Sequence, residues 1–481
     1  MKNRSLVVCA ALLFAFVLAL GGCASSGKKK RTVLMTEYDD ARVGEQASVD
    51  VASQMGVLDD PELNAYVTEI GRKLLRGLPR RSVQYQFSVV DQEEPNAFAL
   101  PGGYIFISRG LLALAQSEDE LACVIGHEIT HVSHRHAAAQ QQLSKRGIAM
   151  PWIKAGKMAA YGRDMERDAD KGGQILCAAA GYDPMGMSTF LKSLGQTERF
   201  RLGYSRNPGW LDSHPGSNER AAVNAVRASE IRWRRDPLLG DTQASLYEQL
   251  EGLPWGQRPE AGVFNGDIFM HPDLDFYIRF PRDWYTQNTN SAVGAQEPRG
   301  RAIVFLSADA PPGDPQKIAE TWAEKTKQTQ HIDVKDSRHV KIGHIDAWRM
   351  KVNSRMGGGL VTSLVTFIPY AGATWRVTAM SLAMDADKYL GRTLVTARSF
   401  RPLTDEEKNS ITESVLHVVK AQPSDSIERL SQRTGNAWDV RATALYNSIF
   451  IDHRFGGGER VKTVQVRPYK VQNEAPSSPG S

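Results

Sequence analysis

The sequence predicts an α+β protein with a mainly helical N-terminal domain, a mixed α/β domain rich in strands and a small C-terminal α/β module. Apolar residues recur at helical spacing around residue 125, whereas beyond residue 263 they alternate with polar ones, which indicates strands. A stretch bearing proline and glycine, Gly252 to Gly262, separates the two patterns and favours a linker. The length of 481 residues suits about three domains.

The N-terminus has the form of a secretory signal. Basic residues at positions 2 and 4 precede 15 uncharged and mostly apolar residues, Leu6 to Leu20, which are short for a membrane span of about 20 residues. The run Leu20-Gly21-Gly22-Cys23 resembles a bacterial lipobox, in which the cysteine is lipidated and becomes the first residue of the mature protein. Ala24 follows rather than Asp, which in Gram-negative lipoproteins implies the outer membrane. We therefore expect a periplasmic lipoprotein anchored to the outer membrane through Cys23, with simple secretion as the alternative.

Helix and strand signals follow in order along the first domain. Asp60 and Pro61 mark a helix start, because proline at the first helical position costs no hydrogen bond. Alternating apolar residues between Val83 and Val89 indicate a half-buried strand. Ser117 to Glu120 has the Ser-x-x-Glu form of a capping box and begins an amphipathic helix. Its apolar face consists of Leu121, Val124, Ile125, Ile129 and Val132.

That helix carries the run His127-Glu128-Ile129-Thr130-His131. Two histidines four residues apart present both imidazoles on one helix face, as a tetrahedral Zn²⁺ requires. Glu128 faces the same cavity and can take a proton from a metal-activated water. The run thus predicts two metal ligands and a general base for metal-assisted peptide hydrolysis. The alternative is that both histidines are polar surface residues of an ordinary helix.

A catalytic zinc needs a third protein ligand and one open position. Downstream, Glu166 and Asp170 lie four residues apart, one turn of a second helix, on the same face. Glu166 is the candidate third ligand, and Asp170 is placed to accept a hydrogen bond from a ligand imidazole and fix its tautomer. By itself, such an acidic pair is also typical of a solvated helix face.

In this order, the motifs resemble those of the gluzincin metallopeptidases, the family that includes HtpX, the CAAX prenyl endopeptidases and the periplasmic BepA-like and LoiP-like proteins. The resemblance covers about residues 38–235 and includes Asn96 to Gly103 before the active-site helix. It implies a zincin-like fold with one Zn²⁺ per chain. It also implies an edge strand, expected within Phe98 to Ile107, that binds the backbone of an extended substrate.

The same resemblance assigns His214-Pro215 and Arg220 to the active site. It implies that His214 either stabilises the oxyanion or occupies the open zinc position in a resting state, so His214 and Arg220 join Glu128 as candidate catalytic residues. For Arg220, orienting the loop or pairing with a carboxylate is favoured over touching substrate. BepA-like relatives carry helical repeats after the peptidase domain, whereas this sequence shows no 34-residue self-similarity.

Beyond the linker, strands are expected together with one helix, Pro315 to Lys327, and a hairpin that pairs Leu360–Ile368 with Thr374–Met380 around Ala371-Gly372. The segment from Phe264 to Trp284 resembles small α/β domains of the PsbP or Mog-like kind, and it carries no catalytic constellation. The C-terminal module resembles the LysM-like tails of some envelope peptidases, which makes peptidoglycan a candidate partner. A small cap without a ligand is the alternative.

Net charge and cysteine content limit the possible partners and disulfide bonds. A formal net charge of +5 is mild for this length and predicts no nucleic-acid partner. Of four cysteines, Cys9 is expected to be removed with the signal peptide and Cys23 to carry the lipid. Cys123 and Cys177 can form a disulfide in an oxidising periplasm or remain buried free thiols, and the sequence leaves both open.

These features predict a zinc-dependent endopeptidase of the bacterial cell envelope that cleaves misfolded or stalled envelope proteins. The alternative is a zinc-holding periplasmic chaperone or scaffold for outer-membrane proteins with little proteolysis, and Glu128 favours the enzyme because a scaffold needs no general base. The expected boundaries are 1–22 for the signal peptide, 23–37 for the lipidated tether, 38–235 for the peptidase domain, 236–262 for the linker, 263–402 for the strand-rich domain, 403–470 for the module and 471–481 for a disordered tail.

Overall fold

A computed structural model of the chain describes residues 37–79, 83–137, 162–200, 210, 214, 217–289, 292–310, 312–356 and 359–471. The predicted signal peptide, Cys23, nearly all of the tether, Pro215 and the tail from residue 472 lie outside the described residues. No helix within the described ranges is both long and apolar enough to cross a membrane.

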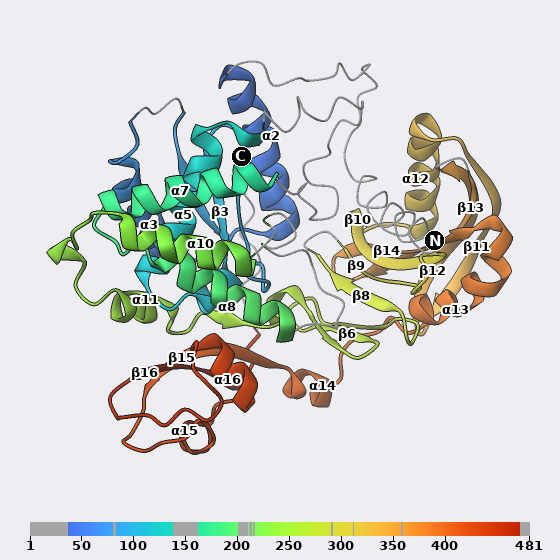
Figure 1. The fold of residues 1–481 in the computed structure, drawn as a ribbon. Helices are drawn as coiled ribbons and strands as arrows, with labels where there is room; N and C mark the ends of the chain where they lie inside the picture. The colour runs from blue at the N-terminus through green and yellow to red at the C-terminus, as the bar shows by residue number, and fades with distance from the viewer. Residues whose placement is uncertain are drawn as a thin grey trace, which may run out of the picture. The chain divides into compact units, whose positions relative to one another are not determined.

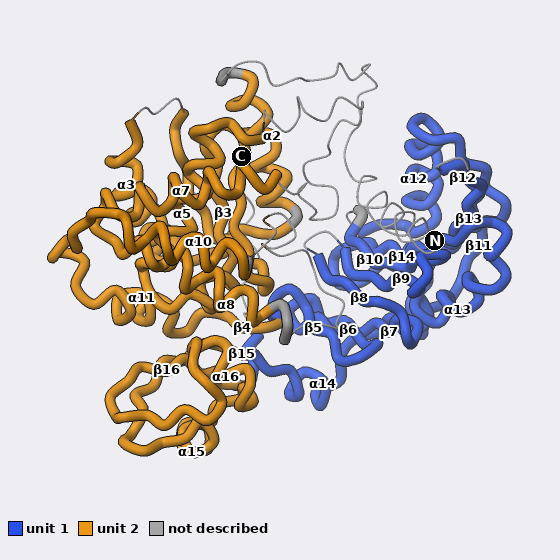
Figure 2. Tube along the Cα trace, viewed as in Figure 1, with its two compact units in different colours: residues 1–28, 257–413, 467–481 blue, residues 29–256, 414–466 orange. Residues whose placement is uncertain are grey.

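The described residues form two compact units, coloured separately in Figure 2. The helical unit comprises residues 29–256 and 414–466, and the sheet unit is built mainly from residues 257–413. Helices and strands in these units confirm the predicted α+β class.

Helices dominate the helical unit, which also holds a three-stranded sheet in the order β1-β3-β2. Strand β3 runs parallel to β1 and antiparallel to β2, so β3 is central and β2 lies at the edge. The elements are α2 (Glu37–Met55), α3 (Pro61–Leu75), β1 (Gln86–Val90), β2 (Ala97–Leu100), β3 (Tyr104–Ser108), α4 (Arg109–Leu114), α5 (Glu118–Ser133), α7 (Arg163–Ala179), α8 (Gly186–Phe200), α10 (Ser217–Glu230), α11 (Thr242–Leu250), β4 (Pro254–Trp255), β15 (Thr412–Lys420), α15 (Ile427–Thr434), α16 (Val440–Tyr446) and β16 (Arg460–Pro468).

Helix α5 lies at the centre of this unit, surrounded by α3, α7 and α8 (Figure 1). Its residues from Glu118 to His131 are all buried, and Leu121, Val124 and Ile125 join the main hydrophobic core. Burial on all sides is more than an amphipathic surface helix would show, because α7 covers the face that carries the histidines. The helix that bears the motif is therefore packed against several described elements.

Glycines allow α5 and α7 to approach closely. A Cβ added at Gly173 of α7 would lie 2.7 Å from the backbone nitrogen of His127 and 3.0 Å from the carbonyl oxygen of Cys123. Across the same contact, a Cβ at Gly126 would lie 3.0 Å from the Gly173 oxygen. Since real Cβ atoms do not approach backbone so closely, only glycine at position 173 permits this spacing.

The predicted linker, residues 236–262, is not an open connection. It contains α11, whose Leu246, Tyr247 and Leu250 are buried in the main core, and then β4. Strand β4 pairs antiparallel with β15, with Trp255 opposite Ser414. The composition of proline and glycine reflects tight turns in this segment, where Gly252 and Gly256 have positive φ.

The predicted C-terminal module, residues 403–470, does not form a third unit either, because residues 414–466 belong to the helical unit. Two strands, β15 and β16, enclose helices α15 and α16 in the chain and pair in the order β16-β15-β4. Trp438 and Tyr446 of this segment stack on each other and meet Trp255 edge-on. These aromatic contacts join the module to the helical core.

The sheet unit is organised around a seven-stranded antiparallel sheet, in the order β11-β12-β13-β14-β10-β9-β8, with a second sheet of three strands, β5-β6-β7. The predicted hairpin and helix are confirmed, because β13 pairs with β14 around Ala371 and Gly372, both with positive φ, and α12 begins at Pro315. The elements are β5 (Val263–Asn265), β6 (Ile268–His271), β7 (Phe276–Arg279), β8 (Tyr285–Asn288), β9 (Val293–Gln296), β10 (Ala302–Ala310), α12 (Pro315–Thr329), β11 (Ile332–Ile342), β12 (Ile345–Met356), β13 (Gly359–Tyr370), β14 (Ala373–Leu382), α13 (Ala386–Arg398) and α14 (Asp405–Ser410).

Candidate metal centre

The start of α5 is fixed by local hydrogen bonds. Ser117 is the N-cap residue, and its side chain accepts a hydrogen bond from the Glu120 backbone, as the capping box predicts. The reciprocal bond of the box is displaced by one residue, because Glu120 Oε2 accepts from the Gln116 nitrogen at 2.9 Å. The N-cap thus lies ten residues before the first metal-ligand candidate, His127, at the place that the sequence predicts.

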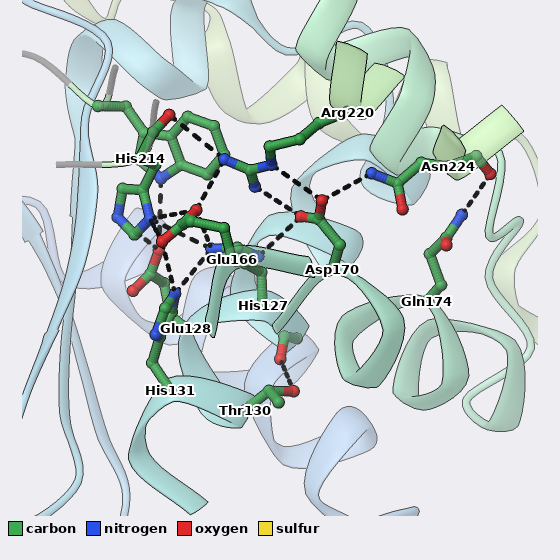
Figure 3. Close-up of polar contacts among 12 residues, drawn as sticks. His127, Glu128, Thr130, His131, Glu166, Asp170, Gln174, His214, Arg220 and Asn224 are labelled. Atoms are coloured by element: carbon green, nitrogen blue, oxygen red, sulfur yellow. Dashed lines mark hydrogen bonds and ion pairs between the residues drawn. The ribbon is translucent and has the colours of Figure 1, made fainter. Parts of the chain in front are cut away.

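Four side chains from three segments converge at one point, as Figure 3 shows. His127 and His131 come from α5, Glu166 from α7, and His214 from the segment before α10. All four are buried. The Nε2 atoms of His127 and His131 lie 2.9 Å apart, and His127 Nε2 lies 3.3 Å from His214 Nδ1.

Glu166 completes the cluster. Its Oε1 lies 3.0 Å from His214 Nδ1 and 3.5 Å from His131 Nε2, and its Oε2 lies 3.6 Å from His127 Nε2. Tetrahedral Zn²⁺ with bonds of about 2.0–2.1 Å needs ligand atoms separated by about 3.3 Å. The observed separations scatter around that value, so this donor set fits a zinc ion.

The environment also favours imidazoles in the form that binds metal. Burial holds the pKa of His131 well below its usual value, and the neighbouring imidazole of His127 lowers that pKa further. A neutral imidazole offers a lone pair, whereas an imidazolium does not. His131 is therefore set up as a ligand before any metal arrives.

Two further polar residues, Asp170 and Arg220, contact the side chains of the ligand candidates. Asp170 Oδ1 lies 3.1 Å from His127 Nδ1, on the side of the ring away from the cluster. Arg220 donates to Asp170 through Nε at 2.9 Å and Nη2 at 2.6 Å, and its Nη1 lies 2.7 Å from Glu166 Oε2. Although burial alone would raise the pKa of the Asp170 carboxyl, the bonds from Arg220 and the contact with His127 hold that pKa well below its usual value.

Glu128 points into the same space as the ligands (Figure 3). Its Oε1 accepts a hydrogen bond from Trp210 Nε1 at 3.3 Å, and its Oε2 is buried without a hydrogen bond from any described residue. The indole of Trp210 also stacks on His214, with ring centroids 4.5 Å apart. Trp210 therefore holds both the predicted general base and the predicted fourth ligand.

The structure brings together every predicted site residue that it describes: His127, Glu128, His131, Glu166, Asp170, His214 and Arg220. Sequence reasoning missed Trp210 and Asn224, whose Nδ2 donates to Asp170 at 2.8 Å. Asn224 could have been found, because it lies one turn after Arg220 on α10 and shares its face. Trp210 lies four residues before His214 but carries no recognisable motif.

The region predicted to hold the substrate-binding edge strand contains two different strands. The expected region, Phe98 to Ile107, covers both β2 and β3, but β3 is the central strand of its sheet. Of these two strands only β2 lies at an edge, and β1 forms the other edge of the sheet. The apolar run across both strands could not separate them, because each is almost completely buried.

Comparisons with known proteins agree with this geometry. The model of peptidase family M48 matches residues 61–227. The beta-barrel assembly-enhancing protease of Escherichia coli strain K12 is 28% identical over 217 residues, which cover 40% of this chain and 43% of that protein. The mitochondrial metalloendopeptidase OMA1 of Arabidopsis thaliana is 30% identical over 224 residues, 43% of this chain and 44% of that protein.

The chain spans less than half the length of these two relatives. Among solved structures, cyanobacterial PsbP from Synechocystis aligns with a TM-score of 0.25 and 10% identity over 31% of this chain and 98% of its own, which is too distant to support a conclusion. The chain therefore carries a domain of peptidase family M48, and all seven described site residues lie within it.

Proposed function

We propose that this protein is a zinc-dependent endopeptidase of the bacterial cell envelope that cleaves misfolded or stalled envelope proteins. The observation that carries the proposal is the convergence of four donor atoms, at spacings that suit Zn²⁺, beside a buried Glu128 carboxylate. His127, His131 and Glu166 are the proposed metal ligands. A scaffold that only held zinc would have no need of Glu128.

Bound Zn²⁺ supplies a Lewis acid that makes water nucleophilic near neutral pH and polarises the scissile carbonyl. Glu128 takes a proton from the attacking water through Oε2 and passes it to the leaving nitrogen. Trp210 keeps Oε1 occupied, so the carboxylate turns its other oxygen toward the reacting atoms. The edge strand β2 is the proposed place where an extended substrate adds its backbone.

Supporting residues have distinct roles in this proposal. Asp170 fixes the tautomer of His127, because a carboxylate near Nδ1 keeps the proton there and leaves Nε2 free for metal. Arg220 is bound to Asp170 and Glu166 on both sides of its guanidinium, so we assign it a positioning role rather than contact with substrate. His214, whose Nδ1 faces the donor cluster, is the proposed fourth ligand in the resting state.

The experiment that tests the proposal is digestion of casein by the full chain, with and without a chelator. Chelator should abolish cleavage, and added Zn²⁺ should restore it. Glu128→Gln should keep the zinc content of the wild type by elemental analysis yet lower the turnover by at least about 10² to 10⁴, because the amide cannot accept the proton. Glu166→Gln should instead weaken zinc binding at His127 and His131, because a ligand of that site is itself altered.

Two outcomes would contradict this reading. Near-normal turnover by Glu128→Gln would remove the general base from the mechanism. A wild-type chain that binds zinc and unfolded clients without cleaving casein would support the alternative, a zinc-holding chaperone or scaffold for outer-membrane proteins.

The location, at the outer membrane, is proposed from the N-terminal sequence and from the E. coli relative, which is named for beta-barrel assembly. Cys23→Ala should leave an uncleaved or unanchored form, because the lipid thioether needs that sulfur. Labelled palmitate measures this directly, and incorporation into the variant would refute the lipobox. Peptidoglycan is a further proposed partner, supported by the LysM-like order β15-α15-α16-β16, and co-sedimentation with purified sacculi tests it.

A further inference from the structure

A second cluster of metal-binding residue types lies beside the catalytic one. It consists of His134, His136 and Asp168, whose ligand atoms all lie within 4.8 Å of one another. One oxygen, Asp168 Oδ2, lies 2.5 Å from His134 Nδ1 and 3.2 Å from His136 Nε2. Neither the peptidase mechanism nor the family motifs use these three residues.

A specific turn builds this cluster. Helix α5 ends at Ser133, and Arg135 then adopts a left-handed backbone with φ of 53°, which is unfavourable for a residue with a side chain. Arg135 Nε donates to Asp40 Oδ2 at 2.5 Å, and this ion pair anchors the turn. The reversal directs His134 and His136, two residues apart, toward the same carboxylate on α7.

Burial of the cluster suits a site that exchanges metal with solvent. The His136 side chain is only 8% exposed, whereas those of His134 and Asp168 are 49% and 46% exposed. His136 is thus held in place by its surroundings, whereas His134 and Asp168 can change conformation to bind a metal ion from solvent. Two imidazoles and one carboxylate form a donor set that suits zinc, nickel and copper, with water filling the remaining positions.

We propose that His134, His136 and Asp168 form a second site for a divalent transition-metal ion, and that its occupancy weakens the catalytic site. The coupling runs through a contact between rings: His136 Nδ1 lies 2.9 Å from His131 Nδ1. The coupling rests on the proposed catalytic zinc, whereas the second site itself does not.

The position of one ring proton explains the sign of the coupling. When a metal binds His131 through Nε2, the proton of that ring is on Nδ1 and points at His136. His136 accepts it through Nδ1 while donating its own proton from Nε2 to Asp168. A second metal on His136 Nε2 displaces that proton to Nδ1, so two N–H groups then face each other at 2.9 Å. Filling either site therefore disfavours the other.

Zinc stoichiometry of the full chain tests the second site. In equilibrium dialysis at rising free Zn²⁺, the wild type should approach two zinc ions per chain, with a weaker second step. Asp168→Asn should weaken that second step at least about 10-fold, because it removes a ligand charge. Asp164→Asn is the matched control, since it removes the same charge from a fully exposed position one turn earlier on α7 and should leave two steps.

Glu166→Gln tests the coupling and separates the two proposals. With the first site impaired, this variant should retain one zinc per chain at His134, His136 and Asp168, bound about 5- to 150-fold more tightly than the second zinc of the wild type. The double variant Glu166→Gln/Asp168→Asn should bind none.

The outcomes that overturn the inference are specific. A wild type that saturates at one zinc, or a second zinc that survives Asp168→Asn unchanged, would refute the second site. An unchanged affinity for that zinc in Glu166→Gln would refute the coupling. Failure of the chain to cleave casein would count against the proposed peptidase and leave these stoichiometries fully interpretable.

Discussion

His214 contacts both of the carboxylates that matter for the proposed chemistry. Its Nδ1 lies 3.0 Å from Glu166 Oε1 and 3.3 Å from His127 Nε2, while its Nε2 lies 3.7 Å from Glu128 Oε1. Nδ1 lies among the donor atoms, so a metal held there would have this imidazole where the proposed mechanism needs substrate or water. This arrangement supports a resting ligand more than a free oxyanion donor.

His214→Ala should therefore retain the zinc content of the wild type and cleave casein faster than the wild type, because the open position becomes accessible. Elemental analysis and initial cleavage rates measure both effects. His339→Ala, which alters an exposed histidine paired with Asp346 in the sheet unit, is the control and should change neither. A fall in rate of about 10² to 10³ would instead assign His214 to the oxyanion.

Among the secondary-structure elements, the crossing of α5 and α7 decides whether the ligands meet. Two ligands come from α5 and one from α7, so their separation depends on how closely the helix backbones approach. Gly126 and Gly173 set that approach, and a Cβ at position 173 would collide with the backbone of α5. Backbone atoms cannot move aside as a flexible side chain would.

Gly173→Ala should force the helices apart, lower the free energy of unfolding by about 1–3 kcal/mol and reduce zinc content. Gly391→Ala is the matched control, because Gly391 lies within helix α13 and its added Cβ would meet nothing within 4 Å. That change should be neutral or stabilise by about 0.5–1 kcal/mol. Normal stability and zinc content in Gly173→Ala would show that α5 and α7 can accommodate a Cβ at this crossing.

How much the sequence predicts follows from how far apart the interacting residues lie. The spacing of His127 and His131 is local to one helix, so helical periodicity alone places both imidazoles together. Glu166 and His214 come from other segments. The need for a third ligand and the spacing to Asp170 predicted Glu166, whereas only the family motifs identified His214. Trp210 and Asn224 act through contacts that no motif marks.

At the scale of the whole molecule, two attachments depend on residues that lie far apart in the sequence. The segment predicted as a linker forms part of the core because β4 pairs with β15, and no local pattern in either strand specifies that partner. The module after residue 403 is likewise predicted as a separate unit, whereas its residues 414–466 belong to the helical unit. Its own elements were recognisable, but its attachment depends on Trp255, Trp438 and Tyr446, which lie far apart in the sequence.

Lys462 of β16 is the clearest mark of that attachment. Its side chain is fully buried, and Nζ donates to the carbonyl oxygens of Ala113 at 2.8 Å and Ala115 at 2.7 Å, at the end of α4. The ammonium also lies 5.0 Å from the centre of the Tyr247 ring. Burial lowers the pKa of Lys462 to about 7, although Glu120 opposes that shift.

This lowered pKa predicts how stability changes with pH. Between about pH 7 and 10.5 the unfolded chain keeps the Lys462 proton while the folded chain has lost it, so the unfolded state binds more protons and stability rises with pH. In urea unfolding, the free energy of unfolding of the wild type minus that of Lys462→Met should therefore rise by about 2 kcal/mol from pH 7 to pH 9. The exposed Lys420→Met is the control, and its curve should stay parallel to that of the wild type. A constant difference between wild type and Lys462→Met across this range would mean that Lys462 remains charged in the folded protein.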